Sequence, residues 1–186
     1  MPSDPSPART RRATGVHART SPAHESFRIA DYPFYRLNRV TALYTECLER
    51  ELKPRGMDQP RWRVLMILNE HNPAAMGLIA ELAVMKLPTL LKVVRRMEDE
   101  ELVRTGARLS DQRVTEVSIT PRGRKQLGWV RKAAADVYHR VTAQLAGSDI
   151  ETLNVLLASL EQSLLGLRPA RGRSTLKATS LRGTPS

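Results

Sequence analysis

The 186-residue chain contains one cysteine, Cys47, and only 4% of its residues are aromatic. A lone cysteine excludes an internal disulfide and is typical of a reducing compartment. The four histidines lie far apart in sequence and no Cys/His spacing matches a zinc site, so we expect no metal. No apolar run approaches the roughly 18 residues of a membrane helix, and the N-terminus lacks the apolar centre of a secretory signal. These absences favour a soluble cytoplasmic protein without a membrane partner.

Sequence motifs of enzymes are also missing. The chain has no G-x-S-x-G, no glycine loop that could cradle a phosphate, and no close Cys–His or paired-carboxylate arrangement. We therefore expect no catalytic residues, no enzymatic activity and no cofactor.

Acidic residues are outnumbered, with 19 Asp and Glu against 30 Lys and Arg and a formal net charge of +11. Residues 1–25 and 168–186 supply +7 of this charge, which leaves +4 on residues 26–167. Neither end has a bulky apolar cluster, so we expect two disordered basic tails around one domain, residues 26–167. Within that domain, residues 86–131 hold eleven basic against six acidic side chains, a clustering that favours a nucleic-acid partner.

Long amphipathic helices are predicted at both ends of this domain. Apolar residues recur at three- and four-residue steps over residues 31–53 and again over about 121–167, where Gly147-Ser148-Asp149 separates two helices. A shorter helix over 59–71 has Pro60 in its first turn. A monomer would leave much of these apolar stripes in water, at a cost of about 25 cal/mol per Å². We therefore predict an obligate two-fold homodimer built from the terminal helices.

Residues 75–124 have the pattern of a DNA-reading unit. A short helix comes first and a second helix follows, basic on one side; then come two β-prone runs, 102–109 and 114–120, joined by Ser110–Arg113. This order predicts a winged helix-turn-helix at about 57–120, in a mainly α fold with a small β-hairpin wing. The apolar sides of the two helices are assigned to Leu78, Ile79, Leu82 and Ala83 and to Leu90, Leu91, Val94 and Met97.

In such a unit the second helix enters the major groove and the wing contacts the backbone or minor groove. Thr89 and Leu91 can contact a thymine methyl group, the helix cations suit phosphates, and Asp111 can hold Arg113 in one geometry. A basic face that is merely solvated, and an Asp111–Arg113 pair that only staples the hairpin, are the alternatives. The predicted DNA-binding residues are Pro88, Thr89, Leu91, Lys92, Arg95, Arg96, Arg104, Arg108, Asp111 and Arg113.

Several short motifs in this order resemble the MarR family of bacterial transcriptional regulators, over about residues 27–167. They are I-A-E-L-A at 79–83, P-T at 88–89, M-E-x-x-x-L-V at 97–103, D-x-R at 111–113 and S-I-T-P-R-G-R at 118–124. The pieces Q-x-x-W-R at 59–63, P-x-L at 88–90 and D-Q-R at 111–113 are similar to the branch that represses homoprotocatechuate and nicotinate breakdown. The resemblance implies a dimeric repressor on a pseudo-palindromic double-stranded DNA operator, with Arg113 in the minor groove. Relatives more often have Ser and Arg where Leu87, Pro88 and Leu91 stand here.

The resemblance also implies a ligand pocket between the first, second and fifth helices, where many relatives bind a small aromatic acid and release DNA. Rings that stack and guanidinium groups that bind a carboxylate concentrate in two segments here, 27–39 and 59–63. A hydroxylated benzoate or hydroxynicotinate is the expected effector, and a dimer core with an arginine rim is the alternative interpretation. The candidate ligand-binding residues are Phe27, Tyr32, Tyr35, Arg36, Arg39, Trp62 and Arg63.

Three other functions fit part of the pattern. An architectural DNA-binding protein with basic tails would need no ligand, and an interaction-only protein could have kept the fold without binding DNA. A redox-sensing repressor would use Cys47, but we expect this thiol to be partly buried beside Tyr44 and Leu48. Glu46, Glu49 and Glu51 would disfavour its thiolate.

Overall fold

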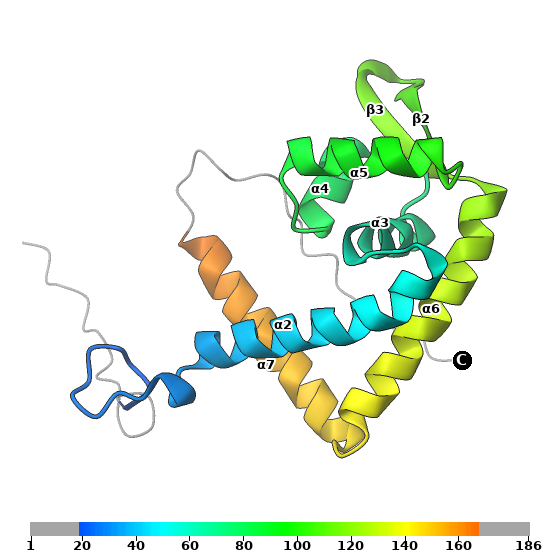
Figure 1. The fold of residues 1–186 in the computed structure, drawn as a ribbon. Coiled ribbons are helices and arrows are strands. Elements are labelled where there is room, and N and C mark those ends of the chain that lie inside the picture. Colours follow the sequence, from blue (N-terminus) through cyan, green and yellow to red (C-terminus); the bar gives the residue numbers. More distant parts are fainter. Residues whose placement is uncertain (1–18, 168–186) are drawn as a thin grey trace, which may run out of the picture. The chain divides into compact units, whose positions relative to one another are not determined.

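The computed structural model describes residues 19–167 (Figure 1). Most of the two predicted tails, residues 1–18 and 168–186, lies outside the described residues. Residues 20–25 form turns and bends, in which the backbone N–H of His24 donates to the carbonyl oxygen of Ser21 at 3.0 Å. The described residues therefore begin a few positions before the predicted domain.

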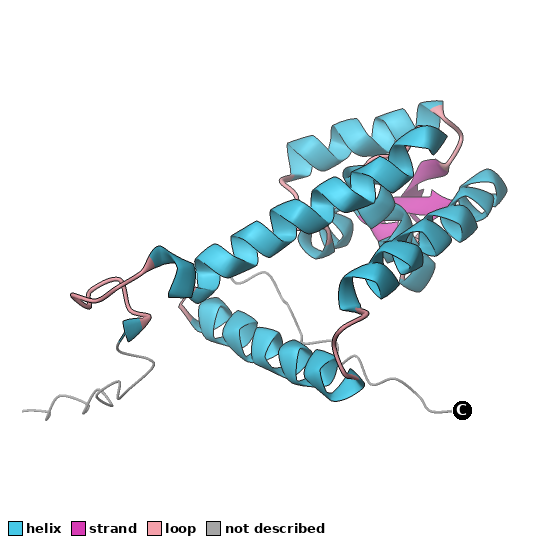
Figure 2. Cartoon of the chain, turned by 60° about the horizontal axis from the view of Figure 1, so that its bottom comes forward, coloured by secondary structure: helices cyan, strands magenta, loops and turns pink. Residues whose placement is uncertain are grey.

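Helices form most of the described chain, and the strands are confined to one small sheet (Figure 2). This confirms the predicted fold class. The helical elements are η1 (Ile29–Asp31), α2 (Pro33–Leu52), η2 (Lys53–Arg55), α3 (Gln59–Glu70), α4 (Met76–Leu82), α5 (Leu87–Asp99), α6 (Pro121–Thr142) and α7 (Gly147–Gly166).

The helix starts follow from capping chemistry. A proline lies in the first turn of α2, α3, α5 and α6, where its missing N–H removes no helical hydrogen bond. The Asp58 carboxylate accepts from the Arg61 N–H at 3.0 Å, and the Thr120 hydroxyl accepts from the Gly123 N–H at 2.9 Å. At α7 the Asp149 carboxylate accepts from the Ala146 N–H at 2.9 Å. These capping side chains fix where α3, α6 and α7 begin.

The sheet has three antiparallel strands rather than the predicted two. They are β1 (Ala74–Ala75), β2 (Val103–Arg108) and β3 (Asp111–Ile119), in the order β1-β3-β2. β1 was not predicted because two alanines carry no strand periodicity; it pairs with β3 through Ala74–Val117 and Ala75–Glu116. The predicted linker Ser110–Arg113 was too long, because β3 already begins at Asp111.

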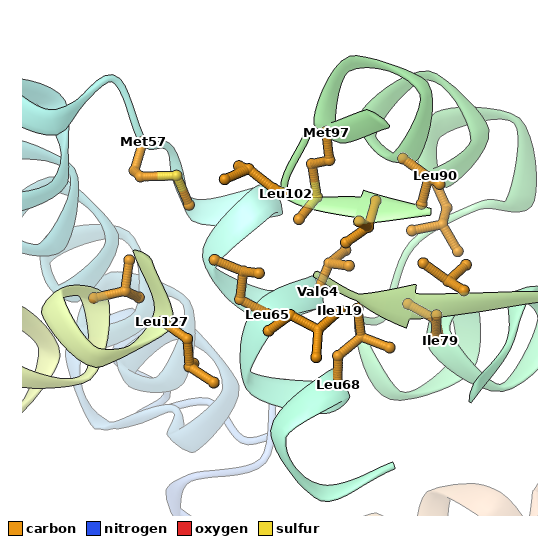
Figure 3. Packing of buried hydrophobic residues seen from close by; sticks show 14 of the residues in the cluster. Met57, Val64, Leu65, Leu68, Ile79, Leu90, Met97, Leu102, Ile119 and Leu127 are labelled. Carbon is orange, nitrogen blue, oxygen red and sulfur yellow. The ribbon is translucent and has the colours of Figure 1, made fainter. Parts of the chain in front are cut away.

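One apolar core joins the C-terminal part of α2 to α3, α4, α5, the sheet and α6. Figure 3 shows labelled side chains from α3, α4, α5, β3 and α6 gathered around α3. Its fully buried members with the largest side chains are Leu48, Leu52, Leu65, Leu68, Ile79, Leu90 and Met97. This core holds the helix-turn-helix and the base of the wing together.

Two predicted helix faces were wrong in part. α4 buries Met76, Ile79 and Ala80, followed by Ala83 just beyond its end, whereas Leu78 is 37% and Leu82 40% exposed. The buried set has the spacing i, i+3, i+4, i+7, and small alanines let α4 approach its neighbours closely. On α5, Leu90, Val94 and Met97 are buried as predicted, but Leu91 is 50% exposed.

The chain divides into two compact units, and the second begins at Arg140. By itself, α7 has no buried residue, and the leucines of its predicted stripe remain accessible, among them Leu153 and Leu160. In the first unit, α2 buries Leu48 and Leu52 but leaves Phe34, Val40 and Leu43 exposed. No helix within residues 19–167 is long and apolar enough to cross a membrane.

Candidate nucleic-acid interface

The outer face of α5 is cationic and free of carboxylates over its first three turns. Leu90, Val94 and Met97 anchor the helix in the core, so the side chains between them point outward. No acidic residue occurs from Leu87 to Met97. The exposed residues include all those predicted to contact DNA from this helix, Pro88, Thr89, Leu91, Lys92, Arg95 and Arg96.

The turn between α4 and α5 is held from α3. Arg63 donates from Nη1 to the carbonyl oxygen of Ala83 at 3.1 Å, and the Met85 N–H donates to the carbonyl oxygen of Ala80 at 2.9 Å. Val84, between them, has a φ of 53°, in the left-handed region that a β-branched side chain strongly disfavours. The turn thus depends on its hydrogen bonds to keep a strained residue in place.

A buried cation, Arg61, connects the beginning of α3 with the end of α5. Its side chain is 3% exposed, and Nη1 lies 2.6 Å from the Glu100 carboxylate. Its Nε lies 3.2 Å from the Asp58 carboxylate, close enough for an ion pair. The angle does not suit a hydrogen bond, and Nε has no hydrogen-bond partner. Nη2 donates to the carbonyl oxygen of Gly56. Sequence reasoning missed this residue, although Arg61 stands at position i of the buried pattern i, i+3, i+4, i+7 of α3.

Arg96 and Arg108, two predicted phosphate contacts, are already ion-paired. Arg96 reaches Glu100 at 3.2 Å and Asp58 at 3.5 Å, while Arg108 reaches Glu116 across the wing at 2.6 Å. Both keep accessible surface, 60% and 40% of their side chains. Each can still face a phosphate, but each also holds an element in place.

The tip of the wing presents Arg113, whose side chain is 91% exposed. Asp111 accepts from its Nε at 3.1 Å and from its backbone N–H at 3.1 Å. These hydrogen bonds from Arg113 hold the pKa of the Asp111 carboxyl below its usual value. The carboxylate is therefore charged at neutral pH and orients the guanidinium, as predicted. Arg104 on β2 is exposed as well.

The wing is joined to α5 through Glu98. This carboxylate near the end of α5 accepts from both the backbone N–H and the hydroxyl of Thr105, each at 2.7 Å. The Glu98 side chain thereby takes the place of a backbone carbonyl as the hydrogen-bond partner of the Thr105 N–H. These two hydrogen bonds join the end of α5 to the base of the wing.

The candidate ligand-binding residues divide between two places. Phe27, Tyr32 and Phe34 form a chain of edge-to-face ring contacts, with centroids 5.9 and 5.5 Å apart. On the next turns, Arg39 donates to the Tyr35 hydroxyl at 3.3 Å. Tyr35, Arg36 and Arg39 line a hollow of about 410 Å³ with Ala30, Val40 and Leu43. Arg36 also lines a second hollow, of about 530 Å³, with Arg19, Thr20, Ser26, Arg28 and Asp31.

Trp62 and Arg63 lie elsewhere, against the core and the helix-turn-helix. Trp62 packs on the core with its buried indole N–H unpartnered among the described residues. Arg63 lies near Tyr44, where burial raises the pKa of the phenol and the positive charge of Arg63 opposes that rise. Tyr44 is nine residues from Tyr35, or roughly 13 Å along α2 at 1.5 Å per residue. Neither hollow includes Trp62 or Arg63.

Cys47 is exposed, which corrects the expectation of a partly buried thiol. The neighbouring Leu48 enters the core, and a rotation of about 100° per residue turns Cys47 outward. No group of three His, Cys, Asp or Glu within residues 19–167 is arranged to hold a metal ion.

Comparisons with known proteins agree with this geometry. The MarR family model matches residues 57–115, which run from before α3 into β3. The HTH-type transcriptional repressor IacR of Pseudomonas putida is 38% identical over 141 residues, covering 76% of this chain and 84% of the relative.

Solved structures show the same fold. A probable transcriptional regulator from Pseudomonas aeruginosa superposes with a TM-score of 0.65 at 28% identity, over 72% of this chain and 99% of that one. CouR from Rhodococcus jostii RHA1, bound to p-coumaroyl-CoA, gives a TM-score of 0.67 at 18% identity, over 72% of this chain and 94% of its own. The chain therefore belongs to the MarR family of transcriptional regulators, and not to a family of enzymes.

Proposed function

We propose that the protein is a repressor that binds a pseudo-palindromic operator through α5 and the wing, and that a small aromatic carboxylate releases it. The observation that carries the DNA part is the acid-free, exposed face of α5 together with the outward Arg113 held by Asp111. A planar cation at a wing tip suits a narrow A/T-rich minor groove. The relative IacR, a repressor by name, supports the direction of regulation.

A homodimer is part of the proposal, because one reading helix covers only a half-site. The exposed leucines of α7 and the uncovered first half of α2 supply apolar surface for a two-fold interface. Covering that surface contributes about 25 cal/mol per Å². Two α5 helices would then read half-sites about 10 bp apart.

The effector site is proposed in the 410 Å³ hollow on α2. Tyr35 offers a ring, and Arg36 and Arg39 offer guanidinium groups that can pair with a carboxylate. CouR with p-coumaroyl-CoA shows that a protein of this fold binds a ligand with an aromatic acyl group. The ligand releases DNA only if it binds more tightly to dimers whose reading helices are wrongly spaced.

Selection of duplexes from a random library, followed by fluorescence anisotropy, tests the DNA part. We expect an enriched inverted repeat, and weaker binding for Lys92→Ala and Arg113→Ala. Removing one phosphate interaction should make the negative slope of log K against log salt less steep by about 0.9. Arg50→Ala, which removes an exposed cation paired with Glu46 on α2, is the control and should leave affinity unchanged. Equal affinity for selected and random duplexes would leave only the architectural function.

A melting-shift panel of hydroxybenzoates and hydroxynicotinates tests the effector part. We expect a stabilising compound that also dissociates the selected duplex, and loss of both effects in Arg39→Met but not in Arg50→Met. If Arg39→Met keeps the response, the ligand binds outside this hollow. If no compound in the panel stabilises the protein, an aromatic carboxylate effector is refuted.

A further inference from the structure

The first turns of α5 carry an apolar ledge, defined here as Leu87, Pro88 and Leu91. Leu87 is 47% and Leu91 50% exposed, and Pro88 is exposed as well. Leu87 and Leu91 are four residues apart, so their side chains are neighbours on one line of the helix. The core takes Leu90, Val94 and Met97 from α5 and leaves the ledge uncovered. Packing within the described chain therefore does not account for these residues.

Cations surround the ledge. Lys86 precedes Leu87, while Lys92 and Arg95 follow on the same outer side, and all three are exposed. Arg96, further round the helix, is engaged by Glu100 and Asp58; within residues 19–167 no ion pair neutralises the other three. Because α5 has no carboxylate before Glu98, its outer face favours a polyanion that presents an apolar group at its centre.

The major groove of DNA presents one apolar group to a protein, the C5-methyl of thymine. Phosphates line both sides of that groove, where they can pair with the cations around the ledge. Duplex DNA satisfies both the charge and the apolar surface in one arrangement.

We infer that the apolar ledge reads thymine methyl groups, so that operator preference depends on this methyl and not only on hydrogen bonds to base edges. The inference rests on the proposed DNA-binding function and identifies the chemical group that gives it specificity. Leu91 is the central specificity residue, Leu87 and Pro88 extend its contact, and Lys92 and Arg95 position the helix on phosphates.

Deoxyuridine is the direct probe, because it pairs as thymine does and lacks only the methyl group. Operators selected with the full chain are resynthesised with single thymines of each half-site replaced by deoxyuridine. We expect at least one position where the Kd rises about four-fold, and about fifteen-fold when both half-sites are changed, from the transfer of one methyl-sized group per contact. Deoxyuridine in flanking sequence should change nothing.

Leu91→Ala connects the effect to the ledge. This variant should bind the thymine operator about as weakly as the wild type binds the deoxyuridine operator, and should lose nothing more on deoxyuridine DNA. Leu87→Ala should show the same coupling more weakly. Leu78→Ala, which removes an exposed leucine from α4 instead, should keep both the affinity and the deoxyuridine sensitivity. Unchanged circular dichroism and melting temperatures establish that the variants are folded.

Each contrary outcome has a distinct meaning. An enriched operator whose affinity changes less than two-fold with deoxyuridine at every position overturns the inference and leaves the proposed function intact. Failure to enrich any operator refutes the proposed function itself. If Leu91→Ala changes the molar mass in light scattering and leaves deoxyuridine sensitivity intact, the ledge contacts protein and the inference is wrong.

Discussion

Replacement of Gly123 by alanine tests how α6 is joined to the winged unit. Gly123 is buried in the first turn of α6, and a Cβ there would overlap the carbonyl oxygen of Leu102 and lie 2.8 Å from Cγ1 of Ile119. The overlapped atom is backbone, so no rotation of a side chain relieves it. The same carbonyl accepts from the Thr120 N–H at 3.1 Å, so α6 can shift only by weakening this hydrogen bond.

The expected size is a balance of opposing effects. Overpacking of this kind costs about 1–3 kcal/mol, and a weakened hydrogen bond adds about 1 kcal/mol. Alanine returns up to about 1 kcal/mol through its higher helix propensity. We therefore expect Gly123→Ala to lower the free energy of unfolding by about 2 kcal/mol.

Gly128 provides the matched control on the same helix. A Cβ at Gly128 meets nothing within 4 Å, so only the propensity gain remains and Gly128→Ala should stabilise by up to about 1 kcal/mol. Urea denaturation at one fixed protein concentration measures both, since the stability of a dimer depends on concentration. The reasoning fails if the two substitutions change stability in the same direction.

Three further predictions concern the other contacts. Arg61→Met should cost about 2–4 kcal/mol, because it leaves Glu100 and Asp58 without their buried cation, whereas Arg50→Met should cost less than about 0.5 kcal/mol; equal losses in urea denaturation would contradict the Arg61 network. Val84→Gly should raise the melting temperature, since it relieves about 1–3 kcal/mol of left-handed strain at an 86% exposed position and costs about 0.5–1 kcal/mol in unfolded-chain entropy; a lower melting temperature would contradict this balance. Glu98→Ala should speed hydrogen exchange at the Thr105 amide and leave the Val117 amide protected, and unchanged exchange at Thr105 would disprove the link.

Periodicity in the sequence predicted the long helices and the fold class, because an apolar repeat of three and four residues over some twenty positions is typical of an amphipathic helix. The start of α6 was predictable too, because Thr120 can cap a helix and Pro121 is favoured in its first turn. Two alanines of β1 carry no such signal. The sequence also does not show which side of α4 is buried. Its seven residues form two apolar faces, and in the folded protein the face with the smaller side chains packs against the core.

The sequence predicted which side chains lie on the outer face of α5, but not which of them are already ion-paired. Lys92 and Arg96 look alike in sequence, but Arg96 is paired with Asp58, which comes 38 residues earlier. Arg61 was overlooked because a charged residue in a run with Trp62 and Arg63 looks like surface. The available signal was the position of Arg61 in the buried repeat of α3. Its partner Glu100 is far away in the sequence, so the ion pair that permits burial could not be predicted.

The double acceptance by Glu98 limits how an effector can act. Since that carboxylate fastens the wing base to the helix that precedes it, bending the wing alone would break two hydrogen bonds at once. If an effector binds in the hollow proposed on α2, its signal would therefore meet least resistance as a rotation of α5 and the wing together, as one DNA-reading head. Regulation by this protein should change the separation between its two heads and leave the shape of each one as it was.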